Sequence, residues 1–235
     1  MTTLTTSCKG CIFNIKEDDV QTSCELGILD NIKKKSSKCE VIDGEYQFDR
    51  VCQFKTKEEK TKEEVLKERY LKFNFIIIDT NLDKTLTTLD SVENLVTKTN
   101  TVVVATVENV KTLTSKLGNK ANYIVTHYFE DDRDIFQNMD DALPKLKNGY
   151  TVVLHEDDEI SRKDLDKIND FVNIKMNKLA LIENSPFIIN TVIYKMLRGN
   201  KGGSSFKDKL VELQEEQEVN SMIFTWEDVD EDTSI

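Results

Sequence analysis

The pattern of apolar runs after residue 72 constrains the fold most. Five short runs rich in Val and Ile predict buried strands, and segments of helical periodicity separate them. The predicted strands are Phe73–Thr80, Thr101–Val107, Ala121–His127, Tyr150–His155 and Lys178–Glu183. The predicted helices between them are Asp83–Lys98, Val107–Leu117, Asp134–Leu146 and Arg162–Val172. Strands that alternate with helices of this length predict βαβ units, and therefore an α/β fold with a mostly parallel sheet and helices on both faces.

Polar residues follow two of these predicted strands, at the edge where an open α/β sheet binds its ligands. Asp79, Thr80 and Asn81 come at the end of the first strand, and His155 with the four acidic residues 156–159 follows the fourth. Clustered carboxylates after a strand indicate a site for a metal ion or a phosphate-bearing ligand. The alternative is a solvated acidic turn that caps the next helix. No G-x-G-x-x-G or G-x-x-x-x-G-K-[ST] motif follows any strand, so the usual dinucleotide binding and P-loop hydrolysis are unsupported.

The cysteines are confined to the first quarter of the chain. All five lie before residue 53, with the spacing C-x2-C-x12-C-x14-C-x12-C. In a chain expected to be cytosolic, clustered cysteines bind a metal or a cluster more often than they form disulfides. A tetrahedral zinc site and a 4Fe-4S cluster both fit, and reduced structural thiols or disulfides are the alternatives. Because this segment has few apolar residues, a bound centre would supply much of its folding energy.

Charge and hydropathy limit the partners of the chain. With 235 residues and a net charge of −11, the chain would be repelled by the phosphates of nucleic acids and anionic membranes. No run approaches the roughly 18 apolar residues of a membrane helix, and the N-terminus has no feature of a secretion signal. We therefore expect a cytoplasmic protein with no nucleic-acid partner and no membrane partner.

These patterns predict four consecutive parts. Residues 1–55 form a cysteine-rich metal or iron–sulfur module, and residues 56–72, which are almost all charged, form a connecting helix. Residues 73–200 form the α/β domain, and residues 201–235 form a C-terminal helix and an acidic tail. We expect the tail to lie over the surface or to be disordered.

The cysteine segment resembles a known class of cluster proteins. The stretches CKGCIFNIKEDDVQTSCELG and DRVCQF are similar to high-potential iron–sulfur proteins, and also to the cysteine heads of some phage-encoded proteins. The resemblance implies that Cys8, Cys11, Cys24 and Cys52 hold the metal or cluster, with Cys39 competing for the fourth place. It also implies a phage origin, and hence a location in the host cytoplasm or the virion.

The α/β part resembles the family 2 glycosyltransferases, which have a GT-A fold. The similar stretches are FNFIIIDTNLDKTLTTLDSVENL and DIFQNMDDALPKLKNGYTVVLHEDDEI, the second of which ends in the place of the D-x-D motif. The resemblance implies that Asp79, Thr80, Asn81 and Glu156 contact a nucleotide. It further implies that Asp157 and Asp158 bind a Mg²⁺ or Mn²⁺ ion that bridges to the diphosphate of a nucleotide-sugar.

The chain also departs from that family. His155 stands where many members carry the first aspartate, the second strand ends in ATVEN rather than an acidic turn, and no catalytic base can be assigned. Two functions therefore stay open. The first is a glycosyltransferase-like protein that binds a nucleotide-sugar through a divalent metal. The second is a non-catalytic virion structural or assembly protein on the same fold, with a metal-stapled N-terminal module and other virion proteins as partners.

Overall fold

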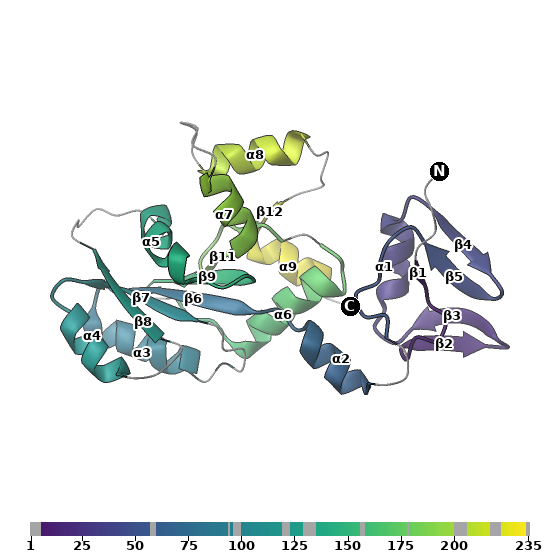
Figure 1. Ribbon diagram of the computed structural model, residues 1–235, viewed down its shortest axis with the longest axis horizontal. Coiled ribbons are helices and arrows are strands. Elements are labelled where there is room, and N and C mark those ends of the chain that lie inside the picture. Colours follow the sequence, from purple (N-terminus) through teal and green to yellow (C-terminus); the bar gives the residue numbers. More distant parts are fainter. Residues whose placement is uncertain are drawn as a thin grey trace. The chain divides into compact units, whose positions relative to one another are not determined.

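The computed structural model (Figure 1) describes residues 6–56, 60–93, 95, 100–118, 123–128, 135–155, 158–177, 179–199, 206–216 and 222–233. The chain divides into two compact units. Met1–Tyr70 and Ile168–Asn177 belong to the first unit, and Leu71–Lys167 and Lys178–Ser234 belong to the second. All five cysteines therefore lie in the first unit, and the five predicted strands lie in the second.

The first unit contains two small antiparallel sheets, one of β1, β5 and β4 and one of β2 and β3. Its elements are β1 (Thr6–Ser7), β2 (Asn14–Glu17), β3 (Val20–Cys24), α1 (Ile28–Lys35), β4 (Cys39–Ile42), β5 (Glu45–Phe48) and α2 (Lys62–Arg69). Both hairpins turn through two residues with positive φ, which are Asp18–Asp19 and Asp43–Gly44. Aspartate and glycine tolerate this backbone, which matches the twist of the flanking strands.

A small apolar core and a set of polar contacts hold the first unit together. The buried core residues are Phe13, Ile28, Leu29, Ile32, Phe48, Phe54 and Val65. Lys35 joins residues 168–177 to this unit. Its ammonium donates to the carbonyl oxygens of Lys175 and Met176 at 2.7 and 2.9 Å and to Asn177 Oδ1 at 2.8 Å. No sequence pattern indicated that this distant segment packs with the cysteine-containing part.

The second unit is built on a seven-stranded sheet in the order β12-β10-β11-β9-β6-β7-β8. Its elements are β6 (Phe73–Ile78), α3 (Leu82–Glu93), β7 (Thr101–Thr106), α4 (Val110–Leu117), β8 (Tyr123–Tyr128), α5 (Ile135–Ala142), η1 (Leu143–Lys145), β9 (Tyr150–Leu154), the start of α6 (Arg162–Asn173), β10 (Leu181–Ile182), β11 (Phe187–Asn190), α7 (Thr191–Gly199), α8 (Phe206–Glu216), β12 (Ile223–Phe224) and α9 (Trp226–Thr233). The residues of α6 from Ile168 on belong to the first unit. Among the described strands of this sheet, β11 alone is antiparallel to its neighbours.

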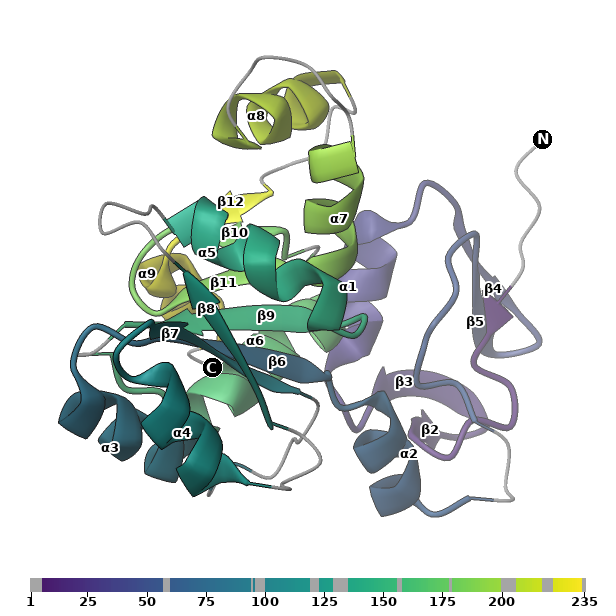
Figure 2. The ribbon, with the colours of Figure 1, turned by 60° about the vertical axis from the view of Figure 1, so that its left-hand side comes forward.

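Helices cover both faces of this sheet. Figures 1 and 2 show α3 and α4 on one face and α5 and α7 on the other. On the second face, Met139 of α5 and Tyr194 of α7 pack with Ile76, Val104 and Val153 of the strands, and all five side chains are buried. The predicted α/β fold, with a mostly parallel sheet between two layers of helices, is therefore confirmed.

The elements missed by the sequence patterns are short or polar. The strands β11 and β12 were not predicted, and β10 has only two residues of the six expected. Residues 226–233, expected in an acidic tail, form the helix α9 instead. Asp228 Oδ2 accepts from the Thr225 N–H at 2.6 Å, and the Asp228 N–H donates back to Thr225 Oγ1 at 3.3 Å. This capping box begins the helix, and the fully buried Val229 anchors it.

A close backbone approach aligns β9 with β6. Gly149 has a φ of 142°, and a Cβ atom at this position would lie 2.2 Å from the carbonyl oxygen of Lys72. The same oxygen accepts a hydrogen bond from the Tyr150 N–H at 2.8 Å. Glycine is therefore required here, because any side chain would separate the two strands at the start of their pairing.

Candidate functional site

The order of the strands defines a topological switch point at one edge of the second unit. The chain proceeds from β6 to β7 and β8 on one side and then returns to β9 on the other side of β6 (Figure 1). β6 and β9 are parallel, and Ile77 pairs with Leu154 next to their carboxyl ends. This reversal is a topological switch point, and ligands of open α/β sheets bind outside the carboxyl ends of the strands there. The two polar segments singled out in the sequence meet at this edge.

Asp79, directly after β6, is engaged by the protein itself. Its side chain is fully buried, and Oδ1 accepts hydrogen bonds from Thr85 Oγ1 at 2.8 Å and from Asn109 Nδ2 at 3.3 Å. Oδ2 accepts from the N–H and Oγ1 of Thr106 at 3.1 and 3.2 Å. These bonds tie the ends of β6 and β7 to the helices that follow. The predicted contact of Asp79 with a nucleotide would require an exchange of these bonds.

Thr80 and Asn81 lie at the surface, directly before α3. Both are exposed, and Asn81 Oδ1 accepts a hydrogen bond from the Lys84 N–H at 3.2 Å. Asn81 therefore caps the first turn of the helix, which is a common role for asparagine at this position. Their position beside the switch point is the one expected for residues that border a ligand, and that role stays a prediction.

The acidic segment after β9 is described only in part. Glu156 and Asp157, predicted to contact the nucleotide and the metal, lie outside the described residues. The Asp158 N–H donates to the His155 carbonyl at 3.1 Å, and Asp158 Oδ2 accepts from the His155 N–H at 2.8 Å. Asp158 Oδ1 accepts from the Ser185 hydroxyl. Asp158 therefore closes a turn, and a metal bound to it would share oxygens that already accept hydrogen bonds.

A capping box starts α6 after this turn. Asp164 Oδ2 accepts from the Ser161 N–H at 2.9 Å and from the Ser161 hydroxyl at 2.6 Å. The Asp164 N–H donates back to Ser161 Oγ at 3.3 Å. The pair satisfies donors that the first turn of a helix leaves free, which fixes the direction in which the chain leaves the acidic segment.

A polar pocket of about 700 Å³ lies between α3 and this segment, a volume within the usual range for small-molecule sites. It is lined by Lys84, Thr87, Thr88, Ser91, Asp158, Glu159, Ile160, Ser161 and Asp164. No sequence pattern had been used to predict that residues of α3 line a pocket. The signal was present, because residues 84, 87, 88 and 91 have the spacing of one helix face. Among its described lining residues, three carboxylates against one ammonium make the pocket acidic.

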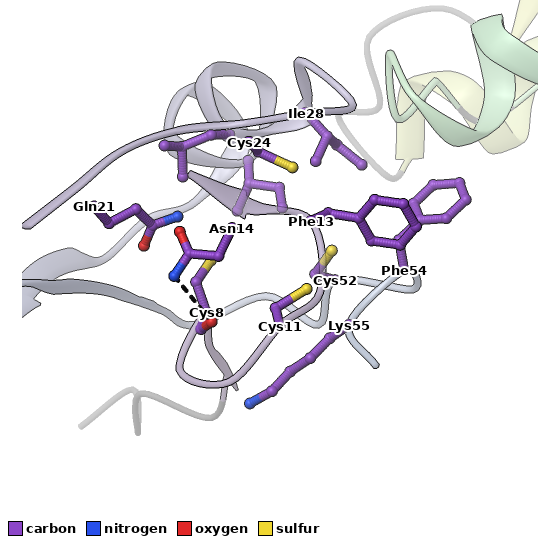
Figure 3. A pocket seen from close by; sticks show the side chains of 12 residues that line it. Cys8, Cys11, Phe13, Asn14, Gln21, Cys24, Ile28, Cys52, Phe54 and Lys55 are labelled. Carbon is purple, nitrogen blue, oxygen red and sulfur yellow. Dashed lines mark hydrogen bonds between the residues drawn. The ribbon is translucent and has the colours of Figure 1, made fainter. Parts of the chain in front are cut away.

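The first unit holds a second and chemically different cavity (Figure 3). Four cysteines, Cys8, Cys11, Cys24 and Cys52, line it together with apolar residues that include Phe13 and Phe54. All five cysteines of the chain are free thiols, and Cys39 is exposed on β4 and does not line the cavity. The structure thus brings together the four cysteines selected from the sequence and separates the competitor from them.

Without a bound cation, the surroundings of these cysteines favour the neutral thiol over the charged thiolate. Burial raises the pKa of Cys8 and Cys24, and it raises the pKa of Cys52 to about 11. Charge on the neighbouring cysteines raises these pKa values further, whereas hydrogen bonds to the sulfurs lower them. Within the described residues, no three side chains of His, Cys, Asp or Glu are already drawn together at the spacing of metal ligands.

Comparisons with known proteins find low similarity. No protein-family model and no curated protein matches this sequence. A solved structure of residues 1–349 of S. aureus TarS in complex with UDP-GlcNAc is 17% identical, with a TM-score of 0.43 over 54% of this chain and 47% of that chain. A mannosyltransferase from Pyrobaculum calidifontis, in complex with GDP-Man and Mn²⁺, is 12% identical, with a TM-score of 0.42 over 54% of this chain and 46% of that chain.

A third similar structure comes from another class of enzyme. It is the 4-diphosphocytidyl-2C-methyl-D-erythritol synthase of Anaerococcus prevotii, 10% identical, with a TM-score of 0.45 over 68% of this chain and 88% of that chain. The chain spans about half the length of the TarS fragment and of the mannosyltransferase. Because all three TM-scores and identities are low, these similarities assign the chain to no family. Within the described residues, no helix is both long enough and apolar enough to cross a membrane.

Proposed function

We propose that the second unit is a glycosyltransferase-like domain that binds a nucleotide-sugar through a divalent metal ion. The observation that carries this proposal is the acidic pocket between α3, which follows β6, and residues 158–164, which follow β9, because β6 and β9 are the two strands of the switch point. The resemblance of the surrounding sequence to family 2 glycosyltransferases supports it. A nucleotide-sugar brings a diphosphate to this edge of the sheet, where its negative charge has to be accommodated.

The chemistry of the pocket favours a bridging cation. Among the lining residues that the structure describes, Asp158, Glu159 and Asp164 are acidic and Lys84 alone carries an ammonium group. A bare diphosphate would be repelled by this excess of negative charge. Mg²⁺ and Mn²⁺ prefer oxygen ligands, so the donor set fits such an ion. Asp157 and Asp158 would hold it, and the ion would stabilise the charge that develops on the departing diphosphate.

The remaining walls of the pocket suit the rest of such a ligand. Thr87 and Ser91 of α3 line it together with Ser161, and their hydroxyls, which donate to oxygens of the chain itself, can still accept hydrogen bonds. Hydroxyls both donate and accept, which matches the many hydroxyls of a sugar or a ribose. Thr80 and Asn81, at the end of β6, are exposed at the same edge and would border the nucleotide.

The second candidate function is a non-catalytic protein on the same fold. One observation favours it: both carboxylate oxygens of Asp158 already accept hydrogen bonds, from His155 and Ser185. The strand-end acidic segment then serves as a structural turn that leads into α6. A phage origin and a place in the virion belong to this candidate and stay predictions.

Isothermal titration of UDP and of GDP in the presence of Mn²⁺ tests the proposal. We expect metal-dependent binding in the micromolar range that Asp157→Ala weakens at least about tenfold, equivalent to about 1.4 kcal/mol. Asp166→Ala removes the same charge from the exposed side of α6 outside the pocket and should leave binding unchanged. If the folded protein binds neither nucleotide with any metal, the donor-site proposal fails and the non-catalytic function is preferred.

A further inference from the structure

The cysteine cavity of the first unit serves no part of the function proposed above. Its four thiols come from separate places in the chain. Cys8 follows β1, Cys11 lies three residues later, Cys24 ends β3, and Cys52 lies in the segment after β5. Their side chains nevertheless surround one space (Figure 3). A shared ligand is one explanation for four thiols that converge from such distant positions.

Each of the four cysteines begins a backbone turn. The carbonyl oxygens of Cys8, Cys11, Cys24 and Cys52 accept hydrogen bonds from the N–H three residues ahead, at 3.0, 3.1, 2.8 and 3.2 Å. Such a turn directs backbone N–H groups toward the side chain of its first residue. Donors aimed at sulfur stabilise a thiolate, which is the form that binds metals.

Buried polar atoms at the cavity point to the same conclusion. Gln21 lines the cavity and is 3% exposed; its Nε2 has no partner at full hydrogen-bond geometry within the described residues, and its side chain lowers the pKa of the Cys8 thiol beside it. A buried unsatisfied donor is unfavourable and needs an explanation. A negatively charged sulfur beside Gln21 supplies one, because it accepts hydrogen bonds more strongly than a neutral thiol. Lys55 also lines the cavity and offsets negative charge there.

The size of the cavity selects the kind of ligand. Its volume is about 20 Å³, and a cavity needs roughly 10–15 Å³ to hold one water molecule. The space accommodates one small species, and four sulfur ligands around it match the coordination of a single ion. Zn²⁺ prefers four tetrahedral sulfur ligands at about 2.3 Å, and closed sites of this kind are structural.

We propose that Cys8, Cys11, Cys24 and Cys52 bind one Zn²⁺ ion that stabilises the first unit. The four thiols release their protons as the four Zn–S bonds form, and the side chains close around the ion. Among the described residues, the apolar cluster beside the cavity has seven buried side chains, so a bound ion adds stability that such a small cluster does not supply.

Metal analysis of the full-length protein, purified without oxygen and without chelators, tests this proposal. We expect one zinc per chain and no visible absorption in the wild type. Cys24→Ser and Cys52→Ser should lose most of the zinc. Cys39→Ser is the matched control, because it removes a thiol of the same unit that lies outside the cavity, and it should keep the full amount.

A second measurement on the wild type covers the case in which the serine variants fail to fold. Co²⁺ added to the metal-free protein should produce the intense blue-green bands of a tetrahedral tetrathiolate site, and Zn²⁺ should displace it. The melting temperature should fall on chelation and recover with Zn²⁺. A wild type that binds no metal overturns the proposal, and so does equal loss of zinc in Cys39→Ser. Stoichiometric iron and sulfide with a brown colour would overturn the single-ion site.

Discussion

Replacement of Gly149 by alanine tests how the second unit aligns the two strands of its switch point. The new Cβ would lie 2.2 Å from the carbonyl oxygen of Lys72, and the backbone φ of 142° is unfavourable for any L-residue. The strain is about 1–3 kcal/mol. Displacement of β9 would also break the 2.8 Å hydrogen bond from Tyr150 to Lys72, which adds about 1–3 kcal/mol.

We therefore expect Gly149→Ala to lower the free energy of unfolding by about 2–6 kcal/mol, a large part of the 5–15 kcal/mol typical of a domain. Urea unfolding followed by tryptophan fluorescence measures this, because Trp226, the single tryptophan of the chain, lies in the second unit. Gly118→Ala is the control: its φ is 51°, but the nearest atom to the new Cβ is 3.9 Å away. Equal destabilisation by the two variants would show that the close approach to Lys72 has no role.

Two other predictions concern the buried Tyr150 hydroxyl and the hydrogen bonds that Lys35 makes with residues 175–177. Burial raises the pKa of Tyr150 above its usual value, opposed by a hydrogen bond with Asn190. Its contribution to stability is therefore complete below about pH 10 and is lost as pH rises through the raised pKa. The melting temperature of the wild type should fall more steeply above pH 10 than that of Tyr150→Phe, and parallel curves would refute this. Lys35→Ala removes three hydrogen bonds of 2.7–2.9 Å and should destabilise the first unit by about 1–3 kcal/mol. The amide hydrogen exchange of residues 168–177 should increase in Lys35→Ala and stay unchanged in Lys34→Ala, which replaces an exposed lysine. No increase in Lys35→Ala would show that the hydrogen bonds of Lys35 do not hold this segment.

The two cavities differ in the kind of metal ion that their side chains can bind. The pocket of the second unit is large, polar and acidic, and its carboxylates suit a hard cation that bridges to phosphates. The cavity of the first unit is small and lined by thiols, which suit a softer ion held in a closed site. Metal analysis with nucleotide titration therefore distinguishes the two proposals, because loss of zinc should leave the Mn²⁺-dependent binding site of the second unit unchanged.

The sequence alone determined the α/β class of the second unit. The runs that became β6, β7, β8 and β9 are continuous and apolar, because strands covered by helices on both faces have no solvent side. Their helices begin and end near the residues expected, since amphipathic periodicity is a local property. The cysteine spacing, with the resemblance it carries, also selected the four thiols that line one cavity.

Only the tertiary structure decided which segments meet. The return of the chain to the far side of β6 places β9 there and so makes the switch point, but no local pattern specifies that pairing. The same holds for β11, whose four residues reverse direction within the sheet, and for the α3 wall of the acidic pocket. Asp79 shows the physical reason most clearly. The sequence presents it as a free carboxylate at a strand end, whereas contacts with residues up to 30 positions away, at Asn109, make it a buried structural acceptor.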